Sequence, residues 1–297
     1  MTAPNFPIVY YYPWQNVPDV LLDSVLAEFA ANGARELVLC NYWCQRILKE
    51  PLFYVELITK MRNSRLSLRE THAPYGPLFD LNCSLRPARK DLIQAHAKMM
   101  ELSADAGCRT YTIHIGAYDC FHRDTTLEEM RDLADEALEA LLPFAQKNNL
   151  VIAVENSFEP FNPPQEVMRL VKKFACGNLG CCYDSGHANM MAAAPGKTAE
   201  SYPPHLRKCW HDQFPFEPDA LGLMAGDIVT CHLHDNCGTC DDHAPIGHGT
   251  IDWKTLITRL KTECPRLVSL QSEVESTAYA QPVRNLCQQF GSLLDLS

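Results

Sequence analysis

The sequence lacks the long apolar segment that a membrane-spanning helix requires, since none of its hydrophobic runs approaches ~18 to 20 residues. Its first residues, MTAPNFPIVYYYP, also lack the basic region and the extended apolar region of a signal peptide. We therefore expect a cytoplasmic protein that makes no contact with a membrane.

Positive charge is also scarce. The chain has 26 lysines and arginines against 36 aspartates and glutamates, a formal net charge of −10, which disfavours indiscriminate binding to nucleic acid. With 46% hydrophobic and 21% charged residues, the composition excludes a disordered chain or a coiled coil and indicates a globular protein. The 14 cysteines show no framework spacing along the 297 residues, so we expect reduced thiols and no disulfide scaffold.

Eight short runs rich in β-branched and aromatic residues alternate with longer amphipathic segments. The runs cover residues 6–12, 34–41, 66–74, 109–116, 150–157, 179–187, 228–236 and 267–275. The clearest helical pattern has apolar residues at three- and four-residue steps from Leu127 to Leu141. Thr125 and Glu128 form the capping box that we predict at its start.

One strand-and-helix unit roughly every 37 residues, repeated eight times, predicts a (β/α)8 TIM barrel of the α/β class, formed as a single domain by residues 1–297. A doubly wound open sheet is the alternative. It usually carries a glycine-rich turn after its first strand, whereas the turn here, YYYPWQNVP, has no glycine. The long segment 188–218 after the sixth run holds several prolines and aromatic residues. We interpret it as a lid, or as a contact between subunits of a homodimer or homotetramer.

Imidazole or carboxylate side chains stand at the ends of six successive runs, from the third to the eighth. They are His72, His114, Glu155, Asp184 with His187, His232 and Glu273, and the loop after the seventh run adds Asp241 and His243. The carboxyl ends of barrel strands form one rim, so these side chains should meet there. Burying them together costs several kcal/mol per uncompensated charge. A divalent ion offsets this cost, and the mixture of carboxylate and imidazole suits Zn, Mn, Co or Mg.

The sequence resembles the xylose isomerase-like TIM barrel superfamily in seven motifs, which read in order THAPYGP, IHIG, AVENSF, YDSGHAN, HLHDN, DDHAPIGHGTIDW and SEVES. That superfamily unites sugar and sugar-phosphate isomerases and epimerases with endonuclease IV, the AP endonuclease family 2. The resemblance covers nearly the whole chain and implies both the barrel fold and a metal-dependent site.

The resemblance implies a set of ligands for each branch of the superfamily. In the isomerase branch, a central divalent ion is held by residues that match Glu155, Asp184, His232 and Glu273. The two glutamates also form the acid and base pair of the epimerases, and the histidine that matches His187 touches substrate oxygens. In the endonuclease branch, three zinc ions use additional positions, which match His72, His114, His187, Asp241 and His243. We therefore expect one or more divalent ions.

These residues predict a metal-dependent isomerase or epimerase of a small polyhydroxy carbonyl compound, in which Glu155 and Glu273 transfer a proton through an enediolate. A sugar or shikimate-type dehydratase stays open, because it abstracts the same proton before losing water. A zinc phosphodiesterase of the endonuclease IV kind is a further alternative. Against it, the loops 235–249 and 156–164 contain no lysine or arginine to contact a nucleic acid duplex. A non-catalytic metal-binding or sugar-binding barrel is the least favoured, because both glutamates are present.

Candidate substrate contacts lie outside this set as well. Trp14 follows the first run and is a candidate for the pocket wall, with packing inside the barrel as the alternative. Trp210 and His211 in the segment 188–218 are expected to close over the ligand.

The loop after the seventh run departs from the family pattern. Epimerases of the family often have an arginine shortly after the strand-seven histidine, but His232 is followed by LHDNCGTCDDH. The departure argues against a free ketohexose as substrate. It also leaves Arg123, Arg207 and Lys208 as candidate contacts for an anionic group.

Two weaker features remain. Cys237 and Cys240 have the C-x-x-C spacing of a redox pair or of half a zinc site, but no second C-x-x-C partners them. The other isolated histidines are expected at the surface, and they are His96, His122 and His205.

Overall fold

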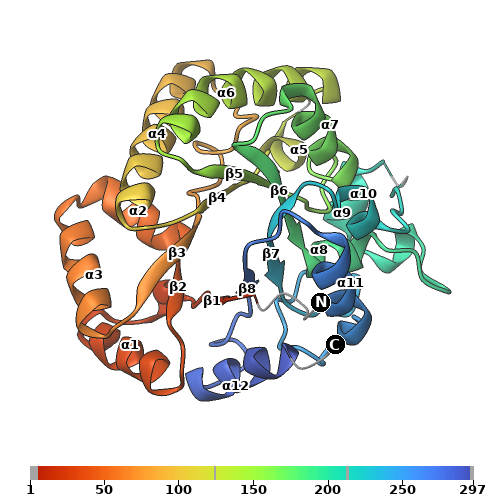
Figure 1. Ribbon diagram of the computed structural model, residues 1–297. Helices are drawn as coiled ribbons and strands as arrows, with labels where there is room; N and C mark the ends of the chain where they lie inside the picture. Colours follow the sequence, from red (N-terminus) through yellow and green to blue (C-terminus); the bar gives the residue numbers. More distant parts are fainter. Residues whose placement is uncertain (1–5, 124, 212–213, 295–297) are drawn as a thin grey trace.

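Eight parallel strands close into a barrel in the computed structural model, which describes residues 6–123, 125–211 and 214–294 (Figure 1). The strands are β1 (Ile8–Tyr10), β2 (Glu36–Leu39), β3 (Ser67–His72), β4 (Thr110–Ile113), β5 (Val151–Glu155), β6 (Leu179–Asp184), β7 (Ile228–Leu233) and β8 (Leu270–Ser272). Each strand pairs with its neighbours in the chain, and β8 pairs with β1. The predicted TIM barrel is therefore confirmed. The predicted limits of the domain, 1–297, include residues 1–5 and 295–297, which lie outside the described residues.

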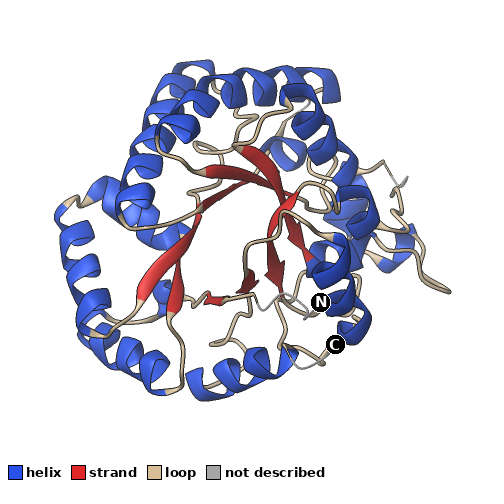
Figure 2. Ribbon diagram, in the orientation of Figure 1, coloured by secondary structure: helices blue, strands red, loops and turns tan. Residues whose placement is uncertain are grey.

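A ring of helices surrounds the strands, as Figure 2 shows. The helices are α1 (Leu22–Ala31), α2 (Asn41–Lys49), α3 (Leu52–Asn63), α4 (Arg89–Asp105), α5 (Tyr118–His122), α6 (Leu127–Lys147), α7 (Pro164–Phe174), α8 (Ser185–Met191), α9 (Pro204–Cys209), α10 (Ala220–Met224), α11 (Trp253–Glu263) and α12 (Val283–Leu293). Short 3-10 turns lie at Trp14–Asn16, Asp19–Leu21, Arg86–Ala88 and Ala199–Ser201. No helix of the described part of the chain is both long and apolar enough to cross a membrane.

The core lies between the barrel and the helices. The apolar stripe predicted from the sequence is the buried face of α6, where Leu133, Leu138 and Leu141 are all buried. Removing a leucine side chain from water contributes about 1.5–3 kcal/mol, so the repetition of such stripes on successive helices holds the ring against the barrel. All 14 cysteines are described, and none forms a disulfide, as expected.

Strand register places the polar residues of the rim at one end of the barrel. Each strand lies within a predicted run but ends two or three residues before it, so His114 follows β4 and Glu273 follows β8. Asp184 is the register partner of His232, the penultimate residue of β7. Because alternate side chains of a strand point to the same face, the residues that end neighbouring strands share the barrel mouth.

The capping box of α6 lies one residue later than predicted. The Thr126 hydroxyl accepts from the backbone N–H of Glu129 at 3.2 Å, and the Glu129 carboxylate accepts from the backbone N–H of Thr126 at 2.9 Å. The prediction of Thr125 with Glu128 was wrong because two threonines and two glutamates in succession give the same spacing in both registers.

His96 is buried, which contradicts the predicted surface position. Its Nε2 donates to the carbonyl oxygen of Phe79 at 2.8 Å, and its Nδ1 accepts from the Tyr111 hydroxyl at 2.8 Å. Burial lowers the pKa of His96 to about 4, so the ring is neutral. The helical spacing from Leu92 to His96 to Met100 on α4 places all three on the core face. His122 and His205 are exposed, as predicted.

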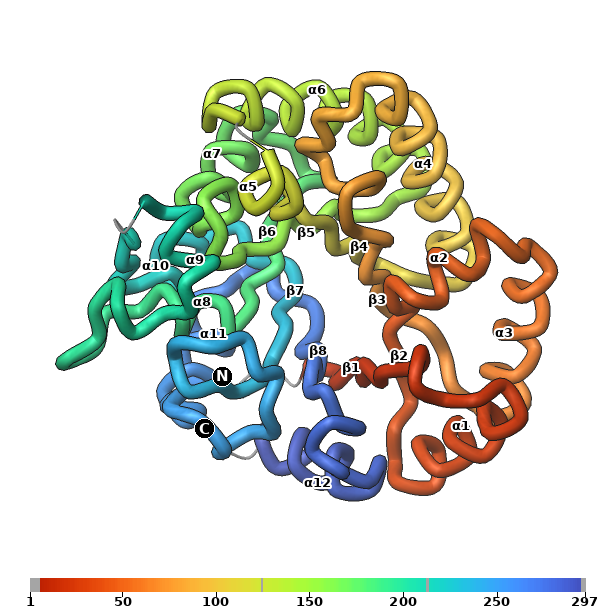
Figure 3. Tube along the Cα trace, turned by 180° about the vertical axis from the view of Figure 1, so that it is seen from behind, coloured from red at the N-terminus to blue at the C-terminus, as the bar shows by residue number. Residues whose placement is uncertain are grey.

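The segment 188–218 is largely ordered structure with a small core of its own. It contains the end of α8, a 3-10 turn and α9, while its residues 212–213 lie outside the described residues. Tyr202 and Phe214 stack at 4.0 Å between ring centroids, and Met190 and Leu206 are buried in the same cluster. Figures 1 and 3 both place this segment at the periphery of the barrel. Its role as a lid or as a contact between subunits stays a prediction.

The capping box gives a prediction about stability. Thr126→Ala removes the acceptor for the Glu129 N–H and should lower the free energy of unfolding by about 1 kcal/mol. Thr125→Ala is the matched control, because the Thr125 hydroxyl has no hydrogen-bond partner among the described residues. Urea denaturation followed by circular dichroism would compare the two. Equal losses in both variants would show that the cap is not at Thr126.

Candidate active site and metal centre

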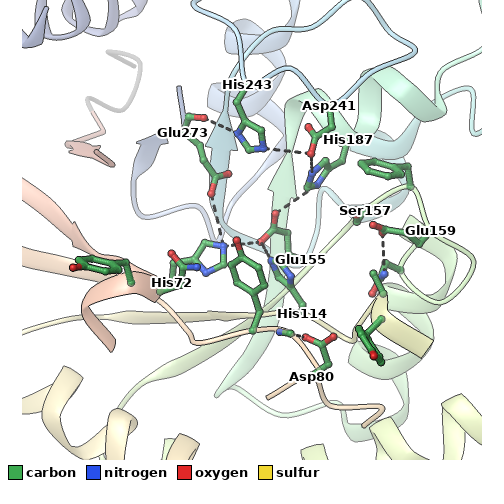
Figure 4. A pocket seen from close by; sticks show the side chains of 18 of the residues that line it. His72, Asp80, His114, Glu155, Ser157, Glu159, His187, Asp241, His243 and Glu273 are labelled. Carbon is green, nitrogen blue, oxygen red and sulfur yellow. Dashed lines mark hydrogen bonds and ion pairs between the residues drawn. The ribbon is translucent and has the colours of Figure 1, made fainter. Parts of the chain in front are cut away.

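A pocket of about 590 Å³ opens at the carboxyl ends of the strands, and side chains of the predicted rim line it (Figure 4). Glu155 stands near its centre. The figure shows His72 and His114 on one side of Glu155, and His187, Asp241 and His243 on the other, with Glu273 above. The structure therefore brings the predicted rim residues together, although they come from strands spread over two thirds of the chain.

The central group consists of Glu155, Asp184, His232 and Glu273, from which one ligand atom each lies within 4.8 Å of the others. All four residues are buried. His232 Nδ1 lies 3.2 Å from Glu155 Oε1 and 2.8 Å from Glu273 Oε2. Nevertheless, both His232 nitrogens and Glu273 Oε2 lack a hydrogen bond of acceptable geometry among the described residues. Polar atoms that are buried, unpaired and convergent match the donor set of a divalent ion.

Glu155 and Glu273 are both ionised next to the imidazoles that flank them. Burial would favour the neutral acid, but His232 and His114 hold the pKa of the Glu155 carboxyl well below its usual value. Burial likewise opposes ionisation of Glu273, yet His232 brings its pKa down to about 2. Each carboxylate can therefore accept a proton at neutral pH.

His72 and His114 flank Glu155 on the β3 and β4 side. His72 Nδ1 donates to the carbonyl oxygen of Ala73 at 3.1 Å, which leaves Nε2 facing Glu155 at 3.6 Å and Glu273 at 3.7 Å. Burial lowers the pKa of His72 to about 4, so these contacts involve a neutral ring. His114 Nε2 lies closer, 3.1 Å from Glu155 Oε2. His72, Glu155 and His232 make up a second group of potential ligands.

A third group lies above β6 and β7 and contains His187, Asp241 and His243 together with His234. His187 Nδ1 lies 2.9 Å from the carbonyl oxygen of Asn156, and His243 Nδ1 lies 2.8 Å from that of Glu273. Nε2 of each ring therefore faces the same atom, Asp241 Oδ2, at 3.4 Å. Ligand atoms bonded to one zinc ion at ~2.1 Å in a tetrahedron lie about 3.4 Å apart. Backbone carbonyls that orient such rings are typical of metal-binding histidines.

Electrostatics in the third group favour bound protons in the absence of a metal. Burial would lower the pKa of His243, but Asp241 beside it raises the pKa to about 10. Burial also opposes protonation of His187, whose pKa Asp184 and Asp241 nonetheless raise well above its ordinary value. Metal binding by this group must displace these protons.

Local sequence explains how the third group is assembled. A Cβ at Gly186 would overlap the His234 ring, so only glycine fits between Ser185 and His187. His234 Nε2 lies 3.1 Å from both Asp184 carboxylate oxygens. From the sequence, His234 is a rim candidate without a clear role, and the structure places it in the third group.

Asp235 holds the loop between β7 and α11. Its carboxylate accepts from the backbone N–H groups of Asn236 and Gly247 at 2.9 Å each, and from Trp253 Nε1 at 2.9 Å. Its backbone pairs with Ala244 in an antiparallel bridge. These bonds fix the two ends of the loop, so Asp241 and His243 return towards the pocket.

Three predicted substrate contacts lie away from the pocket. Trp14 is buried and stacks on Trp43 with 4.5 Å between ring centroids, so its role is packing. The chain turns into a 3-10 helix after β1, which places the Trp14 side chain in the core. Trp210 and His211 line a second cavity beside α5 and α9. Trp210 Nε1 donates to the carbonyl oxygen of Phe158 at 2.8 Å, which holds it there. A substrate in the central pocket would not touch them in this arrangement.

The candidate contacts for an anion are also absent from the pocket. Arg123 and Lys208 line the second cavity, and Arg207 lines neither cavity. Arg123 forms an ion pair with Asp119 at 2.9 Å. Cys237 and Cys240 belong to none of the three ligand groups that the described residues form, which argues against half of a zinc site.

The chain resembles proteins of known family. The model of the xylose isomerase-like TIM barrel matches residues 55–286. An uncharacterized protein of Methanocaldococcus jannaschii is 25% identical over 194 residues, which is 64% of this chain and 59% of that protein. One of Sinorhizobium fredii is 22% identical over 171 residues, or 57% of this chain and 48% of that protein. The match thus spans about half of these curated relatives.

Solved structures share the fold over nearly the full length. A D-tagatose 3-epimerase-like protein is 17% identical at a TM-score of 0.70, covering 98% of this chain and 97% of that one. The D-psicose 3-epimerase of Clostridium cellulolyticum H10, solved with D-tagatose, is 13% identical at 0.67, covering 99% and 98%. The IOLI protein, solved with a zinc atom, is 16% identical at 0.69, covering 98% of each chain. At these identities the likeness shows the fold.

The raised pKa of His243 gives a prediction about pH. In metal-free protein, His243 should keep its proton up to about pH 10, so zinc binding by the third group should strengthen as pH rises from neutral. Asp241→Asn should return the pKa of His243 towards ~6.5. The exposed neighbour provides the control, Asp242→Asn. NMR titration of the histidine ring protons measures the shift, and a native His243 that titrates near neutral pH would contradict it.

Proposed function

The chain belongs to the xylose isomerase-like TIM barrel family, and on that premise we propose that it is a divalent-metal-dependent isomerase or epimerase of a sugar or related polyhydroxy carbonyl compound. One observation carries the proposal. Glu155 and Glu273 are ionised carboxylates at the ends of non-adjacent strands, both line one pocket, and both contact the buried His232. The similar structures support it, since two of them are described as D-tagatose 3-epimerase-like and as D-psicose 3-epimerase.

The metal site of the proposal is the central group of Glu155, Asp184, His232 and Glu273. The fit rests on buried atoms of His232 and Glu273 that make no hydrogen bond and on a donor set of imidazole and carboxylate. When bound there, a divalent ion supplies a Lewis acid that withdraws electron density from a carbonyl group and its adjacent hydroxyl. The similar IOLI structure contains zinc, which supports a zinc-like ion without fixing its identity.

Glu155 and Glu273 move the proton. One carboxylate accepts the proton from the carbon next to the carbonyl and later releases it to solvent. The other carboxylate takes up a proton from water and delivers it to the neighbouring carbon or to the opposite face of the same carbon. The depressed pKa of each carboxyl keeps it ready to accept. Because β5 and β8 are not neighbours in the barrel, the two carboxylates approach a planar enediolate from different sides.

Neighbouring residues orient the substrate next to Glu155 and Glu273 and shield the two carboxylates from water. His187 is fixed by the Asn156 carbonyl and faces the space between Glu155 and Asp241, where it can contact a substrate hydroxyl. Phe158 packs edge-on against the His187 ring with 5.3 Å between centroids and covers that side from solvent. Exclusion of water strengthens the electrostatic contacts that the two glutamates make.

Hydrogen exchange tests the roles of the two glutamates. Glu155→Gln and Glu273→Gln should each reduce the exchange of solvent deuterium into a ketose by at least about a thousandfold, because each removes a proton acceptor. The control is the exposed Glu139 of α6, changed to Gln. NMR follows the exchange, and mass spectrometry of the product separates isomerisation from loss of water by a dehydratase. Undiminished exchange in either variant would overturn the assignment.

A zinc phosphodiesterase is the second candidate, and the three groups of potential ligands, two of which share Glu155 and His232, favour it. Lysine and arginine are absent from the pocket lining, however, and all of these residues in the sequence lie within the described part of the chain. A duplex needs several such phosphate contacts.

A cleavage assay separates the two candidates. We expect no nicking of a fluorescent duplex with one abasic site by the zinc-loaded protein, even at ~50 mM salt, where electrostatic binding is strongest. Gel electrophoresis would detect the product, and an intact duplex serves as the control. Turnover of the abasic duplex at catalytic protein concentration would favour the phosphodiesterase.

A further inference from the structure

Charge in the central pocket is one-sided beyond the residues proposed to hold a metal. The lining contains Asp80, Glu159 and Glu275 in addition to the carboxylates of the ligand groups. No lysine or arginine lines the pocket. Every lysine and arginine of the chain is among the described residues, so none has been left out of this comparison. The remaining polar lining consists of the imidazoles of His72, His114, His187 and His243 and of neutral side chains, which are Gln15, Asn41, Gln45, Ser157, Asn162 and several tyrosines.

Asp80 and Glu159 are held rigidly on one wall. Asp80 is 4% exposed and accepts from the backbone N–H of Gly76 at 2.8 Å. Glu159 is 8% exposed and accepts from Asn162 Nδ2 at 3.0 Å. Asn162 is itself fixed, because its Oδ1 accepts from the Gly116 N–H at 3.0 Å. Neither carboxylate forms an ion pair with any described residue within 4.0 Å.

Gly116 is the residue that brings this wall together. Its φ is +130°, and a Cβ there would overlap the Asn82 side chain and the Cβ of Asp80. The glycine therefore lets the segment that carries Asp80 approach the end of β4, next to His114. Figure 4 shows Asp80 and Glu159 at the edge of the pocket away from Glu273 and His243.

We propose that Asp80, Glu159 and Asn162 form a subsite that binds the end of the substrate remote from Glu273 by accepting hydrogen bonds from hydroxyl or protonated amino groups, and that the pocket excludes phosphorylated and carboxylated substrates. This rests on the proposed function and specifies its substrate class. Buried carboxylates without a cation need hydrogen-bond donors, and a polyol or an amino sugar supplies them. A phosphate group at this end of the pocket would instead meet the like charge of Asp80 and Glu159.

The cations that could serve an anionic substrate lie elsewhere. Arg123 and Lys208 line the second cavity, which shares no lining residue with the central pocket. Exclusion of anions is thus a property of the pocket itself. The rest of the protein surface retains its positive groups.

Matched probes test the proposal on the metal-loaded full chain. D-fructose, 6-amino-6-deoxy-D-fructose and D-fructose 6-phosphate differ only at one end, and D-ribulose with its 5-phosphate gives a shorter pair. Ligand-observed NMR would measure each Kd. We expect each phosphate ester to bind about tenfold or more weakly than its parent sugar. Preference for the amino compound over D-fructose would identify a cationic substrate, and equal binding would identify a neutral one; both agree with the proposal.

Charge reversal in the subsite provides the second arm. Glu159→Lys should raise the affinity for D-fructose 6-phosphate relative to D-fructose by about tenfold, and Glu159→Gln should move the ratio in the same direction by less. The glutamine variant tests the proposal if the lysine variant does not fold. Glu139→Lys, which makes the same charge change on the exposed face of α6, should leave the ratio unaltered.

The outcomes separate this proposal from the proposed function. Esters that bind as tightly as the free sugars, or an unaltered ratio in both Glu159 variants, would overturn the subsite. Failure of all five probes to bind at millimolar concentration would overturn it as well. Binding with the expected preference but without deuterium exchange in any probe would support the subsite and count against the isomerase.

Discussion

The structure depends on keeping ionised carboxylates and imidazoles together in the mouth of a barrel, where the central ones are buried. Glu155 and Glu273 meet at His232, where all three side chains are buried. Each buried charge that lacks a partner costs several kcal/mol, so an apolar environment alone could not hold this group. The fold compensates with the neighbouring imidazoles and with backbone carbonyls that fix the rings of His72, His187 and His243. The unpaired atoms that remain are those a divalent ion can satisfy.

The scaffold meets this demand with short, rigid connections. Gly186 and Gly116 stand where a Cβ would collide with His234 and with Asp80, so both sides of the pocket use glycine to bring polar side chains close to a strand end. Asp235 ties down the loop that carries Asp241 and His243. A closed parallel barrel supports such loops well, because its strands have no free edge and its register aligns their ends.

The net negative charge of this protein describes its pocket more than its outer surface. Several of the negative charges behind the net charge of −10 face the pocket and the proposed metal site. They therefore say less about the outer surface than about the ligand. A pocket whose only positive groups are protonated imidazoles or a bound ion can grip a polyhydroxy compound through hydrogen bonds, while it repels an anion at any part not held by the ion. Substrate choice and metal binding thus have a common electrostatic origin.

Sequence alone determined the eight strands and the barrel and placed the polar residues on one rim, since β-runs at regular spacing can close in few ways and the ends of parallel strands must share a rim. Which four of these residues form the central group was implied by the resemblance to the family. Tertiary structure decided which ring nitrogens face the pocket, that His234 joins the third group and that His96 is buried. It also placed Trp14 in the core, Trp210 and His211 in another cavity, and Asp80 with Glu159 on one wall. The physical reason is that these outcomes rest on contacts between residues far apart in the chain, which periodicity and motif spacing do not encode.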